Sequence, residues 1–380
     1  MDITNYKKTS VGFIPIDWDV KKLGEIAKIK HGKDQKQIIC DDGIYPILGT
    51  GGEIGRTNSF LYDKPSVLIG RKGTIDKPRF MDTPFWTVDT LFYTEISSNL
   101  EPKWLFYKFQ TINWYLYNEA STVPSLIGST ISSIKLSVPS LMEQQKIAAL
   151  LSTWDIAIDN CKNIIEKISC RNKGLEQQFL SGKKRVKGFE KSQWHLISVE
   201  EVAVFKNGKA HENCIDKDGD YFVVNSKFIS TQGKVAKASN ENLCPLFKND
   251  ITMVMSDIPN GKAFAKCFYI PEDDKYTLNQ RICALTARKG TDSKFLFYQM
   301  NRNNYYLAFN NGVSQTNLKK EEVLECPLLM PDIEEQIQIV KLIDTATEEL
   351  NQYQQKLEAL QLQKRGLMQQ LLTGKVRVRV

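Results

Sequence analysis

The chain has 380 residues, of which 42% are hydrophobic and 25% charged, with a formal net charge of +7. This length exceeds one ordinary hydrophobic core, so about two or three domains are expected. No apolar run approaches the roughly 18 residues of a membrane span, and the first residues lack the apolar segment of an export signal. We therefore expect a cytoplasmic protein. The modest positive charge permits a nucleic-acid partner but does not require one.

The eight cysteines lie far apart, without a CxxC pair or a Cys/His cluster of zinc-ligand spacing. Free thiols in a reducing compartment and the absence of a metal site are the expectation.

The first half of the chain opens with a lead, residues 1–10, that has no later counterpart, and we expect it to be mobile. The segments PSVLIGR (65–71) and FWTVDTLFYTEI (85–96) are rich in β-branched and aromatic residues and predict strands. A helix is predicted over 102–119, with Pro102 in its first turn. Its aromatic face is more typical of a protein core than of a surface on which bases stack.

Two polar loops of the first half carry candidate contacts to nucleic acid. GTGGEIG (49–55) and GRKGTIDKPR (70–79) combine turn-forming residues with displayed polar side chains. Such side chains pair with phosphates and base edges, although plain solvated loops have the same composition. The candidates are Thr50, Gly51, Gly52, Arg71, Lys72, Thr74 and Lys77.

A long helix is predicted over 140–182. Ser140 and Glu143 have the spacing of a capping box, and Gly182 suits a left-handed stop. Apolar residues recur at alternating spacings of four and three, which is the heptad pattern of a coiled coil. The predicted seam comprises Ile147, Leu151, Trp154, Ile158, Cys161, Ile165, Ile168, Asn172, Leu175 and Phe179.

The second half repeats the framework of the first. Pro139–Lys183 aligns without a gap on Pro331–Lys375, and QQFLSGK (177–183) returns as QQLLTGK (369–375). Strands are predicted at DITMVM (250–255) and KYTLNQRICAL (275–285), and a helix near 293–309. The interiors, 34–100 and 210–290, share almost no sequence. A duplicated frame with divergent interiors indicates one scaffold that presents two different surfaces.

The loops of the second half carry the same kinds of side chain in NSK (225–227), SDIPNGK (256–262) and Asn279-Gln280-Arg281. The candidate contacts are Ser226, Lys227, Asp257, Asn260, Lys262, Gln280 and Arg281.

A second long helix is predicted over 332–374, with Asp332 and Glu335 in capping-box spacing. Its seam comprises Ile339, Ile343, Ala346, Leu350, Tyr353, Leu357, Leu360, Lys364, Leu367 and Leu371. The polar members, Asn172 and Lys364, occupy the same repeat position, where they either fix the register or extend toward water. Neither helix can bury its seam alone, so we expect them to pair antiparallel about a pseudo-twofold axis.

Patterns of catalytic residues are largely missing. His31, His195 and His211 have no acid–base or metal-ligand spacing, and GTGGEIG fits no phosphate-binding motif. Asp273-Asp274-Lys275 resembles the end of a nuclease motif, but a charged turn is favoured because no convincing upstream acid accompanies it. We expect no catalytic residue and no bound cofactor in this chain.

The repeated helices, entered by P-x-x-x-E-Q (Pro139, Pro331) and left through QQ-[FL]-L-[ST]-G-K, resemble the specificity subunit of type I restriction–modification systems. The segments GRKGTI, FWTVDTLFYTE and SDIPNGKAFAKCFYI are also similar to target recognition domains of that family. The resemblance implies an α+β fold, with two mixed α/β recognition domains joined by two long helices in an antiparallel coiled coil. Its domains would be 1–139, 140–182, 183–331, 332–374 and a tail, 375–380, near the N-terminal module.

The resemblance also implies function and partners. One domain would read each half of an asymmetric, bipartite double-stranded DNA target. Two methyltransferase subunits, and restriction subunits in the nuclease form, would bind the chain and use S-adenosylmethionine, ATP and magnesium. Two alternatives remain: a stand-alone nuclease or methyltransferase with an unrecognised site, and a protein–protein scaffold that does not touch DNA.

Overall fold

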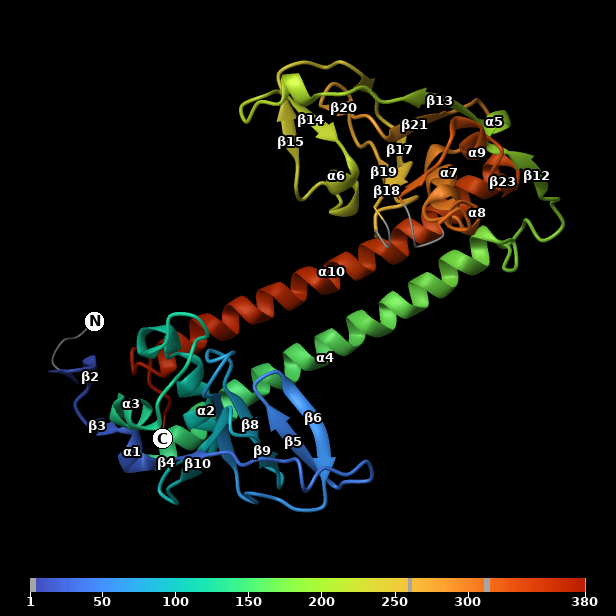
Figure 1. Ribbon diagram of the computed structural model, residues 1–380. Helices are drawn as coiled ribbons and strands as arrows, with labels where there is room; N and C mark the ends of the chain where they lie inside the picture. The colour runs from blue at the N-terminus through green and yellow to red at the C-terminus, as the bar shows by residue number, and fades with distance from the viewer. Residues whose placement is uncertain (1–4, 259–261, 311–314, 380) are drawn as a thin grey trace. The chain divides into compact units, whose positions relative to one another are not determined.

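The computed structural model describes residues 5–258, 262–310 and 315–379. Its contacts divide the chain into unit 1, Met1–Ile164 with Gln354–Val380, and unit 2, Ile165–Tyr353. Both long helices, α4 (Leu141–Leu180) and α10 (Ile333–Leu371), contribute a part to each unit (Figure 1). The compact units therefore cut across the sequential division into modules and helices that the sequence suggested.

Unit 1 holds most of its secondary structure before α4. Its strands are β1 (Tyr6–Thr9), β2 (Gly12–Pro15), β3 (Asp19–Lys22), β4 (Ala27–His31), β5 (Tyr45–Gly49), β6 (Gly52–Thr57), β7 (Ser66–Gly70), β8 (Arg79–Met81), β9 (Trp86–Thr87), β10 (Leu91–Ile96) and β11 (Lys135–Val138). Its helices before α4 are α1 (Leu23–Ile26), α2 (Pro102–Gln110), the 3-10 turn η2 (Trp114–Tyr117) and α3 (Gly128–Ser133).

The two largest sheets of unit 1 lie in its module, beside the two-stranded sheets β1-β2 and β11-β3. The larger has the strand order β4-β10-β7-β8, and the smaller has the order β6-β5-β9, in which β5 and β9 run parallel. All five residues of β7 are buried, as expected for a central strand covered on both faces. Trp104 and Phe109 of α2 are fully buried in the core against Val67, Ile69 and Phe92.

Unit 2 repeats this organisation. Its strands are β12 (His195–Ser198), β13 (Ala203–Asn207), β14 (Tyr221–Val224), β15 (Lys237–Ser239), β16 (Pro245–Leu246), β17 (Ile251–Val254), β18 (Ser256–Asp257), β19 (Cys267–Tyr269), β20 (Tyr276–Leu278), β21 (Ile282–Ala287), β22 (Thr316–Asn317) and β23 (Pro327–Met330). Its shorter helices are α5 (Val199–Val202), the 3-10 turn η3 (Glu212–Cys214), α6 (Ser226–Ser230), α7 (Ser293–Met300), α8 (Asn304–Leu307) and α9 (Lys320–Leu324).

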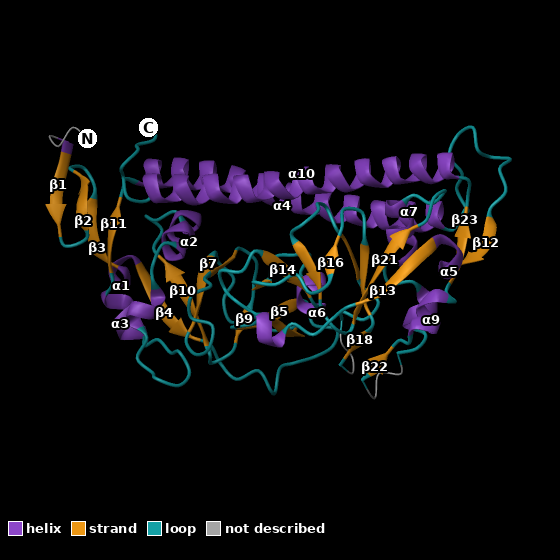
Figure 2. Cartoon of the chain, turned by 90° about the horizontal axis from the view of Figure 1, so that it is seen from above, coloured by secondary structure: helices purple, strands orange, loops and turns teal. Residues whose placement is uncertain are grey.

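The two modules share one topology although their interiors differ in sequence. The sheet β13-β21-β17-β19 matches β4-β10-β7-β8 in order, and the parallel pair β14–β20 matches β5–β9. In Figure 2, β13 lies beside β21 in one module as β4 lies beside β10 in the other. Unit 2 adds β16 at the edge of its second sheet. The sequence repeat is therefore a fold repeat that extends through the divergent segments.

Four element predictions are wrong in detail. The strand predicted over 85–96 is two strands, β9 and β10, separated by residues 88–90, and that over 275–285 divides between β20 and β21. The helix predicted over 102–119 ends at Gln110, where α2 gives way to a turn and then η2, and the one near 293–309 divides into α7 and α8. Apolar residues on both sides of each break conceal it in the sequence.

The two long helices pair antiparallel within each unit. In unit 1, Asp155 of α4 bonds Lys364 of α10, and farther back along α4 Glu143 bonds Arg377, which lies beyond the end of α10. In unit 2, Asn172 of α4 bonds Ala346 of α10. Every residue of the predicted seam is buried or half-buried. The predicted coiled coil is confirmed.

The polar seam residues point inward. Asn172 donates its Nδ2–H to the Ala346 carbonyl at 2.6 Å. The Lys364 side chain is 11% exposed, and its Nζ lies 2.5 Å from Asp155 Oδ1 and 5.0 Å from the centre of the Tyr107 ring. These contacts favour a role in fixing the register over extension into water.

The long helices begin and end close to the predicted residues, but the predicted capping box at the start of α4 is only half present. Gly182 and Gly374 have φ of 67° and 72°, the left-handed conformation of a C-terminal stop. Glu143 donates its backbone N–H to Ser140 Oγ at 3.3 Å, which is half of the predicted capping box. The Glu143 carboxylate instead accepts hydrogen bonds from Trp18 and Arg377, so the reciprocal half is wrong.

The N-terminal lead is ordered where the structure describes it. Residues 6–9 form β1 and pair with β2, and the Tyr6 hydroxyl donates to the Gly374 carbonyl at 2.9 Å. The expectation of a mobile lead is wrong for these residues, while residues 1–4 lie outside the described part. Arg377 Nη2 also reaches Asp17 Oδ2 at 2.7 Å, so the C-terminal tail lies against the start of the first module.

Candidate nucleic-acid interface

The structure brings the predicted loops of unit 1 together at one end of the sheets. Thr50 and Gly51 connect β5 to β6, which begins at Gly52. Arg71, Lys72, Thr74 and Lys77 follow β7. Arg79 joins the two loops, because its Nη2 donates to the Thr50 carbonyl at 2.9 Å. Lys72 and Lys77 are exposed, whereas Thr74 is half-buried. These loops and residues 88–90 are named loop cluster 1.

Residues 88–90 complete this cluster and were missed as candidates. The Arg71 N–H donates to the Thr90 carbonyl at 2.8 Å. The Arg71 guanidinium donates from Nε to the Asp89 carbonyl at 2.7 Å, and its Nη2 lies 3.5 Å from the Asp89 carboxylate. Asp89 therefore orients the arginine that the sequence singled out.

The predicted loops of unit 2 also converge. The Asn279 N–H donates to the Val224 carbonyl at 3.2 Å, beside Ser226 and Lys227 at the start of α6. The Met255 N–H donates to the Arg281 carbonyl at 3.1 Å, beside Ser256 and Asp257. These contacts gather 225–227, 255–257 and 279–281 into loop cluster 2.

Individual candidates in loop cluster 2 are held in different ways. The Asp257 carboxylate binds the protein backbone, because its Oδ2 accepts hydrogen bonds from Ala263 N and Phe264 N at 2.8 and 3.0 Å. Gln280 donates to Glu212 Oε1 at 2.5 Å. Lys227, Lys262 and Arg281 are exposed, and Ser226 is half-buried. Asn260 lies outside the described residues.

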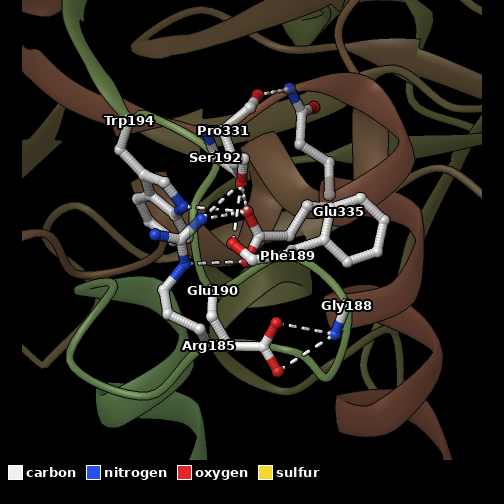
Figure 3. Close-up of polar contacts among 9 residues, drawn as sticks. Arg185, Gly188, Phe189, Glu190, Ser192, Trp194, Pro331 and Glu335 are labelled. Carbon is white, nitrogen blue, oxygen red and sulfur yellow. Dashed lines mark hydrogen bonds and ion pairs between the residues drawn. The ribbon is translucent and has the colours of Figure 1, made fainter.

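A buried glutamate makes the same contacts with an arginine and a tryptophan in each module, beside the coil. In unit 2, Arg185 Nε and Nη2 donate to the two oxygens of Glu335, while Trp194 Nε1 donates to Glu335 Oε2 at 3.0 Å (Figure 3). In unit 1, Arg377 and Trp18 make the same contacts with Glu143. We call each of these an Arg–Glu–Trp clamp.

Electrostatic effects in the unit 2 clamp oppose one another. Burial would raise the pKa of Glu335, but hydrogen bonds from Arg185, Trp194 and Ser192 outweigh burial and hold that pKa below its ordinary value. The Glu335 side chain is 0% exposed, so its charge depends on these donors.

The glutamine after each clamp glutamate fixes the adjacent helix. Gln144 donates to the Pro139 carbonyl at 2.9 Å and accepts from the Glu101 N–H at 2.9 Å. Gln336 makes the same contacts with Pro331 and Asp292, at 2.7 and 2.8 Å. Glu101 and Asp292 are the N-caps of α2 and α7. The P-x-x-x-E-Q motif therefore joins the start of each long helix to its recognition module.

Comparison with known proteins gives the family. A model described as the type I restriction modification DNA specificity domain matches residues 15–169 and 191–361, which together cover most of the chain. The chain belongs to this family. The type I restriction enzyme MjaVIII specificity subunit of Methanocaldococcus jannaschii is 22% identical to it, over 99% of this chain and 96% of the relative.

Solved structures support the fold of this type I specificity chain. A crystal structure of the type I restriction-modification system S subunit from M. genitalium has a TM-score of 0.62 and 17% identity, covering 94% of this chain and 96% of that one. A chain from a study of complex assembly and conformational transition of the type I R-M system has a TM-score of 0.58 and 10% identity, covering 96% and 99%. At these identities the likeness concerns the fold alone.

Sequence reasoning missed the clamps of this type I specificity chain, although their signal was present. Glu143 and Glu335 are identical positions of the repeat, as are Trp18 and Trp194. No local pattern indicates that these glutamates and tryptophans meet.

The described residues contain no group of His, Cys, Asp and Glu that could hold a metal ion, and no described helix is long and apolar enough to cross a membrane.

Proposed function

We propose that this chain is the DNA-reading subunit of a type I restriction–modification complex, in which each module reads one half of an asymmetric, bipartite target. One observation carries the proposal: the two modules share strand order and clamp but present different side chains in loop clusters 1 and 2. A common scaffold with divergent loops suits the reading of two different sequences. Contacts of lysine side chains with DNA phosphates would supply affinity, and contacts with base edges would supply specificity.

The paired helices act as the spacer between the half-sites. Their seam is continuous, and their registers are fixed by Asn172 in unit 2 and Lys364 in unit 1. A paired coil bends less than a single helix, so its length limits the distance between attached modules.

The chain works with partners that supply the chemistry. Two methyltransferase subunits bind it and transfer methyl groups to adenine from S-adenosylmethionine, and restriction subunits join in the nuclease form, where they use ATP and magnesium. The recognition chain itself contributes no catalytic residue.

The test compares the purified chain with the chain assembled with its methyltransferase subunits. Each is given DNA, S-adenosylmethionine and Mg²⁺, and methylated adenines are mapped. The complex should methylate a two-part sequence that the isolated chain leaves untouched. Methylation or cleavage by the isolated chain would instead identify an enzyme, and binding by the complex without sequence preference would identify a scaffold.

A further inference from the structure

One junction recurs in both modules at the centre of each loop cluster. In unit 1 it comprises the turn 88–90 and the residue that follows β7, Arg71. In unit 2 it comprises the turn 279–281 and the residue that follows β17, Met255. Each turn connects the two strands into which a predicted single strand divides.

The backbone of each junction is held by matching contacts. Val88 N donates to the Leu48 carbonyl at 3.0 Å in unit 1, and Asn279 N donates to the Val224 carbonyl at 3.2 Å in unit 2. The bond from Arg71 N to the Thr90 carbonyl corresponds to the bond from Met255 N to the Arg281 carbonyl.

A glycine packs against each turn. A Cβ added to Gly32 would lie 2.0 Å from the Val88 carbonyl oxygen, and one added to Gly208 would lie 1.9 Å from the Asn279 carbonyl oxygen. Neither position accepts a larger residue without a backbone shift. The turns are therefore fixed by the repeated frame, while their side chains are free to differ.

Each junction contains an arginine, but the two arginines come from opposite sides of it. In unit 1 the arginine is Arg71, after β7, and the turn supplies Asp89. In unit 2 the arginine is Arg281, on the turn, and the strand side supplies Met255. Each module therefore has one arginine in its junction, although the two arginines occupy different sequence positions within it.

Both arginines keep donors for a ligand. Arg71 uses Nε and Nη2 toward Asp89, which leaves Nη1 and part of Nη2 for a further partner. Arg281 is exposed, and its guanidinium makes no hydrogen bond or ion pair among the residues that the structure describes. Its neighbour Gln280 is held by Glu212.

Arg281 also adopts a costly backbone conformation. Its φ is 66°, in the left-handed region that disfavours residues with a Cβ. Such strain persists where the surrounding structure imposes it, and it is concentrated at ligand contacts. Glycine would remove this strain, so the backbone conformation alone does not account for an arginine at this position.

We propose that the junction arginines, Arg71 and Arg281, are specificity-determining residues, each of which reads a guanine in its own half-site. Arginine donating to guanine O6 and N7 is the commonest specific contact in the major groove. This inference rests on the proposed function, because it takes the loop clusters to face DNA.

The test uses Arg281→Gly in the complex with the methyltransferase subunits. Binding is measured on duplexes that carry the mapped target and on duplexes with single base-pair substitutions across both half-sites. Arg288→Ala is the matched control, because Arg288 is an exposed arginine at the opposite end of β21. Arg71→Ala tests the other module in the same way.

Arg281→Gly should reduce discrimination at a single G·C position of one half-site by about 5- to 150-fold and leave the other half-site unchanged. Arg71→Ala should act on the other half-site only, and Arg288→Ala on neither. The melting temperature of Arg281→Gly should equal or exceed that of the wild type, since glycine accepts a positive φ. If this variant is less stable, Arg281→Asn keeps a left-handed residue and replaces it in the assay.

Unchanged discrimination by Arg281→Gly at every position would overturn the inference. A uniform loss of affinity over all duplexes, with a smaller salt dependence, would also overturn it, since that result identifies a phosphate contact. A wild-type complex that fails to discriminate between duplexes would contradict the proposed function instead, so the two failures are distinguishable.

Discussion

Arg185 and Glu335 form a bidentate ion pair, in which Nε donates to Oε1 at 2.9 Å and Nη2 donates to Oε2 at 2.7 Å. Arg185 follows the end of α4, and Glu335 lies in the first turn of α10. The pair thus joins the end of one long helix to the start of the other within unit 2. Trp194, which directly precedes β12, donates to the same carboxylate and so connects the ion pair to the first strand of the second module.

Replacing Glu335 should weaken unit 2. Glu335→Gln removes the charge that Arg185 faces and one acceptor of the Trp194 indole, so we expect a loss of about 2–4 kcal/mol in the free energy of unfolding. Because hydrogen bonds hold the pKa of Glu335 below its ordinary value, the stabilisation by its charge is present at neutral pH and falls as the pH drops through that lowered pKa. Chemical denaturation should therefore show the wild-type advantage narrowing below about pH 4.

The matched control is Glu334→Gln, which changes the neighbouring exposed carboxylate and should alter stability by less than about 0.5 kcal/mol. If both variants lose the same stability, the effect is one of overall charge, and the clamp has no special role.

Lys108 gives a second test, because unit 2 has a neutral residue in its place. Lys108 Nζ donates to the Leu372 carbonyl at 2.7 Å and to Ser137 Oγ at 3.0 Å. At the corresponding position Gln299 Nε2 donates to the Leu180 and Leu329 carbonyls at 2.8 and 3.1 Å. Burial lowers the pKa of Lys108 to about 8.

Lys108→Gln should stabilise unit 1 near neutral pH by about 1–2 kcal/mol, because it removes a buried charge and keeps a donor. The wild type should gain stability between about pH 8 and pH 10.5, where the unfolded chain still binds a proton that the folded chain has lost. The variant should lack this rise. If the free energies of unfolding of the wild type and the variant change in parallel with pH, Lys108 does not titrate as described.

The clearest local signals in the sequence predicted the coil. Heptad spacing gave the seam, and Gly182 and Gly374 gave the helix ends, because each depends only on residues close in the chain. The two-module α+β organisation also followed from the repeat. These features required no knowledge of which distant residues meet.

Long-range contacts account for most of what was missed. Glu143 has the spacing of a capping residue, yet a cation far along the chain, Arg377, and the Trp18 indole compete successfully for its carboxylate. The sequence predicts one strand over residues 85–96 because Val88, in the break, and Leu91, directly after it, are both apolar, and both are buried in the structure. The break at 88–90 is imposed by contacts with Leu48 and Arg71 in other segments.

Exchange of one interior should change one half-site. Replacing residues 34–100 with those of a relative alters loop cluster 1, including Thr50, Arg71 and Lys72, and leaves loop cluster 2 intact. Methylation mapping should show one new half-site and one unchanged half-site. Changes in both would mean that the modules do not read independently.

Described residues near the two ends of the chain contact one another, so we expect that the ends can be joined by a short linker. Tyr6 contacts Gly374, and Asp17 contacts Arg377, all within unit 1. A permutant with a short linker between the ends and a new start at Lys187 should fold and methylate the same target. In unit 2 the chain continues from Arg185 directly into the second module, whereas in unit 1 noncovalent contacts, including the Arg377 clamp, connect the end of α10 to the first module, so the linker supplies the missing covalent connection. A start at Gly174, inside α4, should prevent folding. A Lys187 permutant that folds but cannot assemble would contradict the symmetry of the two halves.

The most direct test of the account is the length of the unspecified gap between half-sites. Removing 159–165 from α4 and 354–360 from α10 deletes one heptad from each helix and preserves the seam spacing and the Asp155–Lys364 and Asn172–Ala346 bonds. A heptad extends about 10 Å, which corresponds to about three base pairs of DNA. Mapping of methylated adenines should show a gap shortened by that amount and both half-sites unchanged. Altered half-sites with an unaltered gap would contradict the account.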